Sequence, residues 1–236
     1  MLAMRHPELA LAVQAREGGG PLPFTVRRII CGGYTSRDPA EVERHMRELE
    51  ALGIPRPDAA PTFFSVASYL ATTAARIEVQ GPFTSGEVEF VLLFGPQGPW
   101  VTVGSDQTDR FFERHSMLAG KQLCPKVIGT TVWPLGEVED HWDELTLRSW
   151  VRSGRMRQLY QEAPLGAHLE PAALLPRIRR YAGRELEGVA FFSGTVPTRS
   201  GEVIYGDAYE LELADPRLDR VIRTQYTVHV LEATRR

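Results

Sequence analysis

The segment TSGEVEFVLLFG, at residues 84–95, constrains the fold more than any other part of the sequence. Apart from Glu89, every residue from 88 to 94 is apolar. A strand that is apolar on both faces is normally buried on both. Glu87 and Glu89 lie two residues apart, so their side chains point to the same face. The sequence therefore predicts a central strand that carries two carboxylates into the protein interior.

Two carboxylates on one face of a buried strand repel each other, by roughly 4 kcal/mol at about 4 Å and an effective dielectric constant near 20. A protonated carboxyl group, paired arginines or a bound cation would each relieve this repulsion. A second apolar strand, at residues 100–105, ends at Asp106, so a third acid can meet the first two. Three carboxylates suit Mg²⁺ or Mn²⁺, although solvated charges at strand ends have the same spacing.

Lysine is rare in this chain, which has only Lys121 and Lys126 among its 27 basic residues. Both lysines lie in the segment GKQLCPK. Lysine is a compact point charge whose pKa can be tuned, and arginine is not. The pair indicates a role that arginine cannot fill, with chance clustering as the alternative.

The composition excludes several classes of protein. The chain has 236 residues, of which 43% are hydrophobic and 24% charged, as is usual for a globular domain. A net charge of -3 and a pI near 6.1 argue against nucleic acid or an anionic membrane as a partner. The two cysteines form no zinc motif or disulfide framework, which favours the cytoplasm. No apolar run approaches the roughly 20 residues that span a membrane.

The remaining pattern is mostly that of β-strands. Strands at 9–14 and 24–31 are predicted to form a hairpin, and a helix is predicted to begin at Pro39 after the cap Asp38 and to end at Gly53. Further strands are predicted at 62–67, 76–81, 87–95, 188–197, 201–213 and 220–233, with helices in 107–122 and 170–183. The fold class is therefore β-rich α+β, with an N-terminal strand and helix lead-in at 1–60 and a main domain at 61–236.

Four segments resemble motifs of the fumarylacetoacetate hydrolase family, in the order in which the family has them. SGEVEFVLLFG resembles its E-x-E strand, and GSDQTDR resembles its D-x-[TS]-x-R segment. FFSGTVPTRSGEVIYGDAYELEL resembles its G-T-P segment, and RIICGGYTSRDPAEVERHMRELEALGIP resembles its N-terminal strand, turn and H-x-x-E helix. The chain is most similar to a bacterial branch with no assigned function. The resemblance implies a mixed β-sheet roll.

The chain also departs from the family pattern. Only 16 residues separate Glu89 from Asp106, fewer than is usual in the family. Val88 stands where a proline usually separates the glutamates, and the G-T-P segment is G-T-V-P. These departures affect the substrate pocket more than the metal ligands.

The resemblance assigns metal binding and catalysis to particular residues. It implies that Glu87, Glu89 and Asp106 bind Mg²⁺ or Mn²⁺. It implies that His45 and Glu48 activate a water molecule, and Glu41 is an alternative to Glu48 because it lies four residues before the histidine.

The resemblance also implies residues that contact the substrate. Lys121 would hold the substrate carboxylate or a developing enolate, with Lys126 as the competitor for that role or a surface charge. Arg110 would bind substrate or anchor the acids. Gly194 and Thr195 would complete the substrate site.

These residues together imply a hydrolase that cleaves a C–C bond in a small, acylpyruvate-like 2-oxo acid through an enolate on the metal ion. A decarboxylase, an isomerase or a hydratase could use the same site, since fold does not determine function. A non-catalytic binding protein is the alternative from another class. The family implies a homodimer, and neither nucleic acid nor a membrane is expected as a partner.

Overall fold

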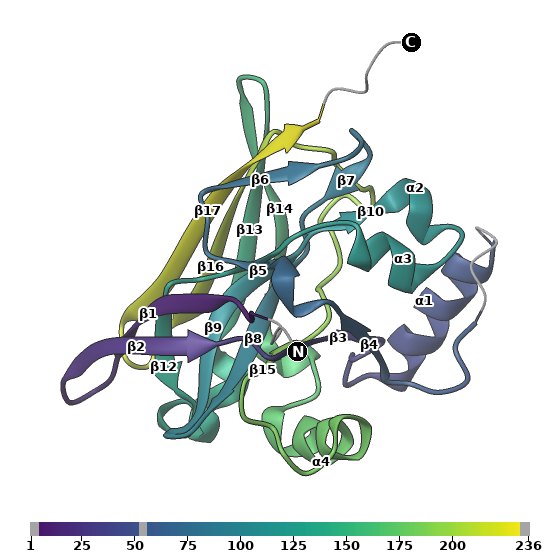
Figure 1. The fold of residues 1–236 in the computed structure, drawn as a ribbon. Helices are drawn as coiled ribbons and strands as arrows, with labels where there is room; N and C mark the ends of the chain where they lie inside the picture. Colours follow the sequence, from purple (N-terminus) through teal and green to yellow (C-terminus); the bar gives the residue numbers. More distant parts are fainter. Residues whose placement is uncertain (1–4, 52–55, 232–236) are drawn as a thin grey trace.

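The computed structural model describes residues 5–51 and 56–231, without the side chains of residues 45, 48, 49 and 51. Its architecture is two packed β-sheets with helices at the periphery (Figure 1). Across the larger, mixed sheet the strands are β2 (Gly19–Thr25), β1 (Glu8–Gln14), β12 (Thr131–Pro134), β9 (Gly98–Asp106), β8 (Val88–Gly95), β15 (Val189–Phe192), β3 (Arg28–Gly33) and β4 (Thr62–Val66). The short strand β11 (Lys126–Ile128) also pairs with β9, and β5 (Ala71–Thr72) pairs with β11.

The second sheet has five strands and lies against one face of the first. In order they are β14 (Met156–Pro164), β13 (Thr146–Ser153), β16 (Ala208–Asp215), β17 (Arg220–Val230) and β6 (Arg76–Val79). A separate pair joins β7 (Thr84–Ser85) to β10 (Thr108–Asp109). The predicted β-rich α+β class with a mixed sheet is confirmed.

Strand β8 lies between two hydrophobic cores, as its two apolar faces predict. Phe90 and Leu92 belong to the core between the sheets, which also contains Leu211 of β16. Val91 and Leu93 belong to a second core on the opposite face. Because both faces are covered, Glu89 on the second face is removed from water, at 0% exposure.

The predicted N-terminal helix forms as α1 (Pro39–Ala51). Asp38 caps it, because the Asp38 side chain accepts a hydrogen bond from the backbone of Ala40 at 2.8 Å. Its predicted end at Gly53 lies outside the described residues. The helix at 170–183 also forms, as α4 (Pro171–Ala182), with Leu174 and Ile178 buried in the core between the sheets.

The strands predicted at 188–197 and 201–213 are shorter or shifted, as β15 and β16, and two further elements differ in kind. The hairpin partner of β1 is β2, which begins at Gly19, so the glycine- and proline-containing segment is itself a strand. Edge strands tolerate proline, because one side of their backbone forms no ladder. The predicted helix in 107–122 is two short helices, α2 (Arg110–Glu113) and α3 (Met117–Gln122), each started by a side-chain cap.

Strands from both sides of residue 60 share the larger sheet, and the division into a lead-in at 1–60 and a main domain at 61–236 stays a prediction. Within the part of the chain that the structure describes, no helix has the length and apolar character needed to cross a bilayer.

Candidate functional site

The three predicted metal ligands meet at one end of the β8–β9 pair. Glu87 directly precedes β8, Glu89 is its second residue, and Asp106 ends β9. The backbone NH of Asp106 donates to the carbonyl of Glu87 at 3.1 Å, which aligns the two strand ends. One carboxylate oxygen from each of the three residues lies within 4.8 Å of the others. These acids with Lys121 and Lys126 are called the acid–lysine cluster below.

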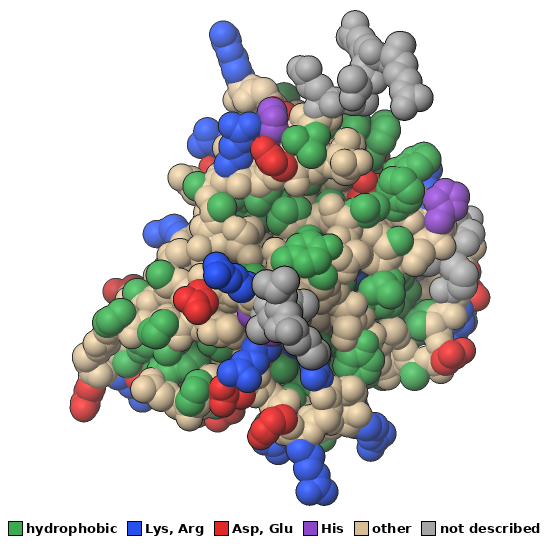
Figure 2. All heavy atoms as spheres, viewed as in Figure 1, with side chains coloured by type: hydrophobic (Ala, Val, Ile, Leu, Met, Phe, Trp, Pro, Cys, Tyr) green, Lys and Arg blue, Asp and Glu red, His purple; other side chains and the backbone are tan. Residues whose placement is uncertain are grey.

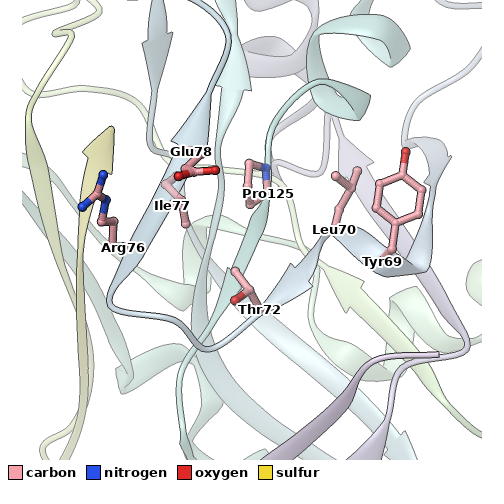
Figure 3. Close-up of a pocket in the computed structure, with 7 residues that line it drawn as sticks. All are labelled: Tyr69, Leu70, Thr72, Arg76, Ile77, Glu78 and Pro125. Atoms are coloured by element: carbon pink, nitrogen blue, oxygen red, sulfur yellow. The ribbon is translucent and has the colours of Figure 1, made fainter. Parts of the chain in front are cut away.

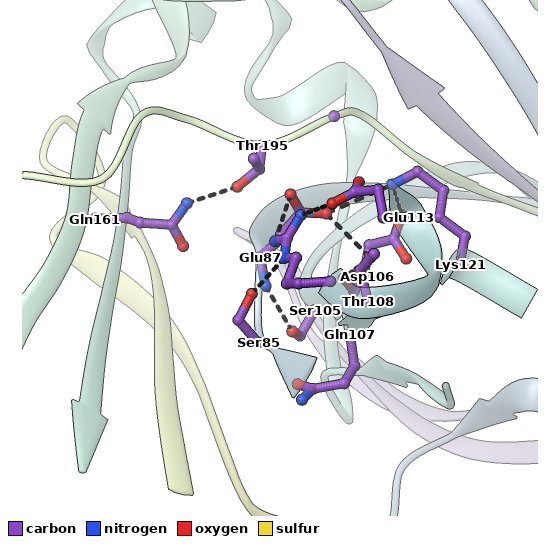
Figure 4. A network of polar contacts seen from close by, with 12 residues as sticks. Ser85, Glu87, Ser105, Asp106, Gln107, Thr108, Glu113, Lys121, Gln161 and Thr195 are labelled. Carbon is purple, nitrogen blue, oxygen red and sulfur yellow. Dashed lines mark hydrogen bonds and ion pairs between the residues drawn. The ribbon is translucent and has the colours of Figure 1, made fainter. Parts of the chain in front are cut away.

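Asp106 is bound by both lysines of the chain. Lys121 Nζ donates to Asp106 Oδ2 at 2.6 Å, and Lys126 Nζ lies 2.6 Å from Oδ1 as an ion pair. Figure 4 shows Glu87, Asp106 and Lys121 converging. Burial alone would raise the pKa of Asp106, but the two ammonium groups outweigh it and hold that pKa below its usual range. Asp106 is therefore ionised at neutral pH.

Glu87 is held by a second cation at the edge of the cluster. Arg110 NH2 lies 2.9 Å from Glu87 Oε1, and Lys121 Nζ lies 3.5 Å from Oε2. Burial opposes ionisation of Glu87, but Arg110 and then Lys121 outweigh it, so the pKa of Glu87 is lowered. Arg110 also donates hydrogen bonds to the Glu113 carboxylate and, from Nε at 2.7 Å, to the Ser85 hydroxyl.

Glu89 has the opposite electrostatic balance. Its Oε2 accepts a hydrogen bond from the backbone of Gly194 at 2.9 Å, whereas its fully buried Oε1 has no donor among the described residues. Burial, and then the neighbouring charge of Asp106, raise the pKa of Glu89 well above its usual value. A buried carboxylate oxygen without a donor is costly unless a cation binds it.

The donor set fits a hard divalent cation. All three carboxylates offer oxygen, which Mg²⁺ and Mn²⁺ prefer, and each carboxylate oxygen has lone pairs beyond those used by the lysines and Arg110. The unpartnered oxygen of Glu89 points to a missing positive charge at the centre of the group. The buried Glu–Glu–Asp group can therefore hold a divalent metal ion.

Gly194 and Thr195 lie next to the acids, in the segment after β15. Gly194 has φ +88°, and a side chain there would meet Thr35 Oγ1 at 2.6 Å, so only glycine places its NH against Glu89. The Thr195 hydroxyl donates to the carbonyl of Val88 and accepts from Gln161 Nε2 at 2.7 Å. Both residues thus support β8 and its acids in this structure.

Two predicted catalytic residues lie in α1, where the structure describes only their backbones. His45 and Glu48 are helical, three residues apart, but their side chains lie outside the described part of the chain. Glu41, the alternative to Glu48, accepts a hydrogen bond from the Ser36 hydroxyl at 3.0 Å. The water-activating role of this helix stays a prediction.

The sequence interpretation missed several partners of the cluster. Lys126 is fully buried, so its interpretation as a surface charge is wrong. Glu113 and Ser85, which bind Arg110, were not singled out, because Glu113 lies outside the motif segments and Ser85 has no role in its motif. The scarcity of lysine singled out Lys126 but not its burial against Asp106.

A separate surface cavity of about 480 Å³ opens beside β5 and β6 (Figure 3). It is lined by Tyr69, Leu70, Thr72, Arg76, Ile77, Glu78 and Pro125. None of these residues belongs to the acid–lysine cluster, although Pro125 directly precedes Lys126. The acids and this cavity are therefore in different places.

Solved structures with the same fold come from the fumarylacetoacetate hydrolase family. A Burkholderia cenocepacia protein provisionally named a fumarylpyruvate hydrolase is 17% identical, with a TM-score of 0.61 and 98% of each chain covered. Yeast ynq8, a fumarylacetoacetate hydrolase family protein, is 14% identical, with a TM-score of 0.59 over 87% of this chain and 94% of that one. A 2-keto-3-deoxyarabinonate dehydratase is 14% identical, with a TM-score of 0.64 over 91% of this chain and 78% of that one.

These likenesses confirm the fold that the sequence motifs predict, at identities too low to transfer a reaction. No curated protein sequence matches the chain. One family model matches residues 32–226, a range that includes the acid–lysine cluster and α1. The chain thus has the fumarylacetoacetate hydrolase fold and belongs to the DUF2848 family, which is described as a protein family of unknown function.

Proposed function

We propose that this chain is a divalent-metal-dependent hydrolase that cleaves a C–C bond in a small, acylpyruvate-like 2-oxo acid. One observation supports this most directly: the buried Glu89 Oε1 has no donor in the part of the chain that the structure describes, and Glu89 lies beside two further carboxylates. The names of similar folds add support, since they include a fumarylpyruvate hydrolase and a 2-keto-3-deoxyarabinonate dehydratase. Both enzymes are named after substrates that are 2-oxo acids.

The ion in this proposal is Mg²⁺ or Mn²⁺, held by Glu87, Glu89 and Asp106. When bound, it would polarise the oxygens of a 2-oxo acid and stabilise the negative charge that develops as the C–C bond breaks. The three protein ligands leave coordination positions open, as a catalytic site requires.

Lys121 supplies the second positive charge to the substrate in this proposal. It lies on α3 at the edge of the cluster and keeps 5% exposure. Burial would lower the pKa of Lys121, but Asp106 and Glu87 outweigh it and raise that pKa well above its usual value. The permanently charged ammonium group can hold the substrate carboxylate or the developing enolate.

Other residues of the chain orient the reactants. Arg110 holds Glu87 and is proposed to contact the substrate from the same side. Gly194 and Thr195 hold the segment after β15 against the acids and are proposed to border the substrate. His45 and Glu48 on α1 are proposed to remove a proton from the attacking water, because residues three apart on a helix share a face.

The compartment and assembly belong to the same proposal. We place the protein in the cytoplasm, in line with two buried cysteines that form no disulfide. We propose a homodimer, and exposed apolar side chains are available for an interface over α2 and α3, where Figure 2 shows a group of them. They are Phe111, Phe112, Leu118 and Leu123. Neither nucleic acid nor a membrane is proposed as a partner.

A lyase is the second candidate, because a dehydratase is among the similar folds. Decarboxylation, isomerisation or hydration would use the same metal ligands and Lys121 without requiring His45 and Glu48 to activate water. A binding protein that retains the metal but turns over no substrate is the remaining alternative.

The metal site is tested first by thermal unfolding after chelator treatment. We expect Mn²⁺ or Mg²⁺ at about 100 times its Kd to stabilise the wild type by about 2.7 kcal/mol, a rise in Tm of about 5 °C or more. Glu89→Gln is expected to lose this rise. Glu212→Gln is the matched control, since Glu212 is a buried acid paired with arginines elsewhere. Equal responses of wild type and Glu89→Gln would reject the site.

The reaction is then tested by incubating the metal-loaded protein with acylpyruvates and 2-keto-3-deoxy acids, with products identified by NMR. Two carboxylic acid fragments from an acylpyruvate support hydrolysis, whereas loss of water or CO₂ supports a lyase. Retained metal binding with no product from any substrate favours a binding protein.

A further inference from the structure

Lys126 is the most unusual charged group in the molecule. It is a strand residue of β11 with 0% exposure, and it is among the largest fully buried side chains. Lysine is rarely buried completely unless it is paired. Its position follows from sheet pairing, because β11 is antiparallel to β9 with Lys126 directly opposite Asp106. Gly104 permits this pairing, since a side chain there would lie 2.7 Å from the carbonyl oxygen of Val127.

The Lys126 ammonium group is held in place by two consecutive residues at the end of β9, Asp106 and Gln107. It lies 2.6 Å from Asp106 Oδ1 and donates to the backbone carbonyl of Gln107 at 2.6 Å. Strands β5 and β9 flank β11 on both sides, and the Lys126 side chain has 0% exposure. Lys121, in contrast, is on a short helix, and its hydrogen-bond partners among the described residues are both carboxylates. The two lysines thus differ in freedom although both bind Asp106.

The charges of the site show what Lys126 changes. The connected acids are Glu87, Glu89, Asp106 and Glu113, and the connected cations are Arg110, Lys121 and Lys126. With all acids ionised these groups carry one net negative charge, and a divalent ion changes this to one net positive charge. Without Lys126 the loaded site would be neutral. Removing Arg110 or Lys121 would change the sum in the same way, but Lys126 is the one of these three cations with 0% exposure, so its charge is the one fixed inside the fold.

We propose that Lys126 is a fixed internal cation that couples divalent metal binding to the binding of a monoanionic 2-oxo acid. This inference rests on the proposed function, since it concerns the same acids. The lysine weakens binding of the metal alone by repulsion, and the substrate carboxylate neutralises the excess charge when both ligands are present. By linkage, the metal and the anion must then strengthen each other's binding by the same factor. Lys126 acts through charge and position, without contacting the substrate.

The test measures Mn²⁺ affinity by calorimetry on the full chain after chelator treatment, with and without oxamate. Oxamate is an unreactive monoanion with the shape of a 2-oxo acid. We expect oxamate to tighten Mn²⁺ binding by the wild type about tenfold or more. Lys126→Gln keeps a donor toward the Gln107 carbonyl and removes the charge. We expect this variant to bind Mn²⁺ alone about tenfold more tightly and to lose most of the enhancement by oxamate.

Two further variants separate this effect from general destabilisation. Arg220→Gln removes a buried cation that pairs with Asp215 and Glu137, away from the acids. It is expected to leave both Mn²⁺ affinity and the oxamate effect at wild-type values. Lys126→Met, which has no donor at all, is expected to resemble Lys126→Gln in Mn²⁺ affinity, and a melting curve of each variant establishes that it is folded.

The outcomes distinguish this inference from the proposed function. If Lys126→Gln is folded and matches the wild type in Mn²⁺ affinity and in the oxamate effect, the role of Lys126 is wrong while the metal site stands. If neither protein binds Mn²⁺ with or without oxamate, the metal site itself is wrong and the inference falls with it. A wild type that binds Mn²⁺ equally well with and without oxamate also overturns the coupling.

Discussion

Among the described residues, two groups of charged side chains in the interior differ in how fully their acids are paired. In the acid–lysine cluster, Glu89 Oε1 has no hydrogen-bond donor among the described residues. The second group, called the His141 cluster, contains His141, Asp215, Arg220 and Glu137. There the Asp215 carboxylate meets His141 Nε2 at 2.9 Å and accepts from Arg220 Nε at 3.1 Å.

The backbone completes the pairing in the His141 cluster. Asp215 Oδ1 also accepts from the backbone NH groups of Arg217 and Leu218, in the turn after β16. Glu137 accepts from Arg220 NH1 and from the backbone of Arg16, both at about the ideal distance. The carboxylates of Asp215 and Glu137 are therefore satisfied within the fold, and the atom of this cluster left without a hydrogen-bond partner among the described residues is Arg220 NH2. Complete pairing of the acids indicates a structural role, and the incomplete pairing of the Glu89 carboxylate indicates a site that receives a cation.

The largest effect is expected for Asp106→Asn. This change leaves two buried ammonium groups, those of Lys121 and Lys126, without their shared counter-ion. Removing one partner of a buried ion pair costs about 3–5 kcal/mol, and the higher end is expected here. Urea unfolding of chelator-treated protein measures this loss in the free energy of unfolding. A loss below 1 kcal/mol would mean that the lysines find other partners.

A somewhat smaller loss, about 3 kcal/mol, is expected for Asp215→Asn in the His141 cluster. The amide keeps one acceptor for the turn NH groups but removes the charge that faces Arg220 and His141. Urea unfolding measures this loss of stability, and thermal unfolding with and without Mn²⁺ measures the rise in Tm on metal binding. That rise should equal the wild type's, and its loss would contradict the division into a structural and a ligand-binding cluster.

His168 shows how burial changes the pKa of a histidine whose neighbouring charge, that of Arg37, has the same sign. Burial, and then the neighbouring Arg37, lower the pKa of His168 to about 4, and Thr35 Oγ1, whose proton goes to the Ser193 carbonyl, lies 3.3 Å from Nδ1. The imidazole is thus neutral and donates from Nδ1. The unfolded chain binds the proton near pH 6.5 and the fold does not, so stability falls as pH drops from 6.5 toward 4.

This histidine should therefore cost about 2 kcal/mol of stability between pH 7 and pH 5. Urea unfolding at both pH values measures the loss in the wild type and in His168→Gln, which keeps a donor but cannot titrate. We expect the variant to show a pH dependence weaker by that amount. Identical pH profiles would show that folding does not lower the pKa of His168.

The smallest effect on stability is expected for Glu89→Gln without metal, within about 1 kcal/mol of the wild type. The raised pKa of Glu89 favours the neutral carboxyl group when no cation is bound, and glutamine is a neutral side chain of similar shape. Urea unfolding in the presence of a chelator provides the value. A loss like that of Asp215→Asn would place Glu89 among the structural acids.

Much of the site could be predicted from local patterns. The two-residue spacing of Glu87 and Glu89 places both on one face of any strand, and the apolar residues that follow require a buried one. Asp38 and Pro39 specify the start of α1 through a cap and a fixed φ, and the cap hydrogen bond forms. These features depend on residues a few positions apart, so the sequence alone contains the information.

The partners of the acids could not be predicted in the same way. Lys126 lies 20 residues after Asp106, and only the pairing of β11 with β9 brings it opposite and excludes water. Arg110 meets Glu87 through the short β7–β10 pair, and Gly194 reaches Glu89 through a segment more than 100 residues away. Strand β2 forms from a segment with two prolines because it lies at the sheet edge.

The sequence by itself determined the central strand, its two acids, the capped helix and the presence of two lysines in a chain that otherwise uses arginine. Only the tertiary structure decided which charges are buried, which cations hold Asp106 and Glu87, and which carboxylate oxygen has no donor. The physical reason is that strand geometry is a local property of the backbone. The desolvation and pairing of a charge depend instead on every element that packs around it.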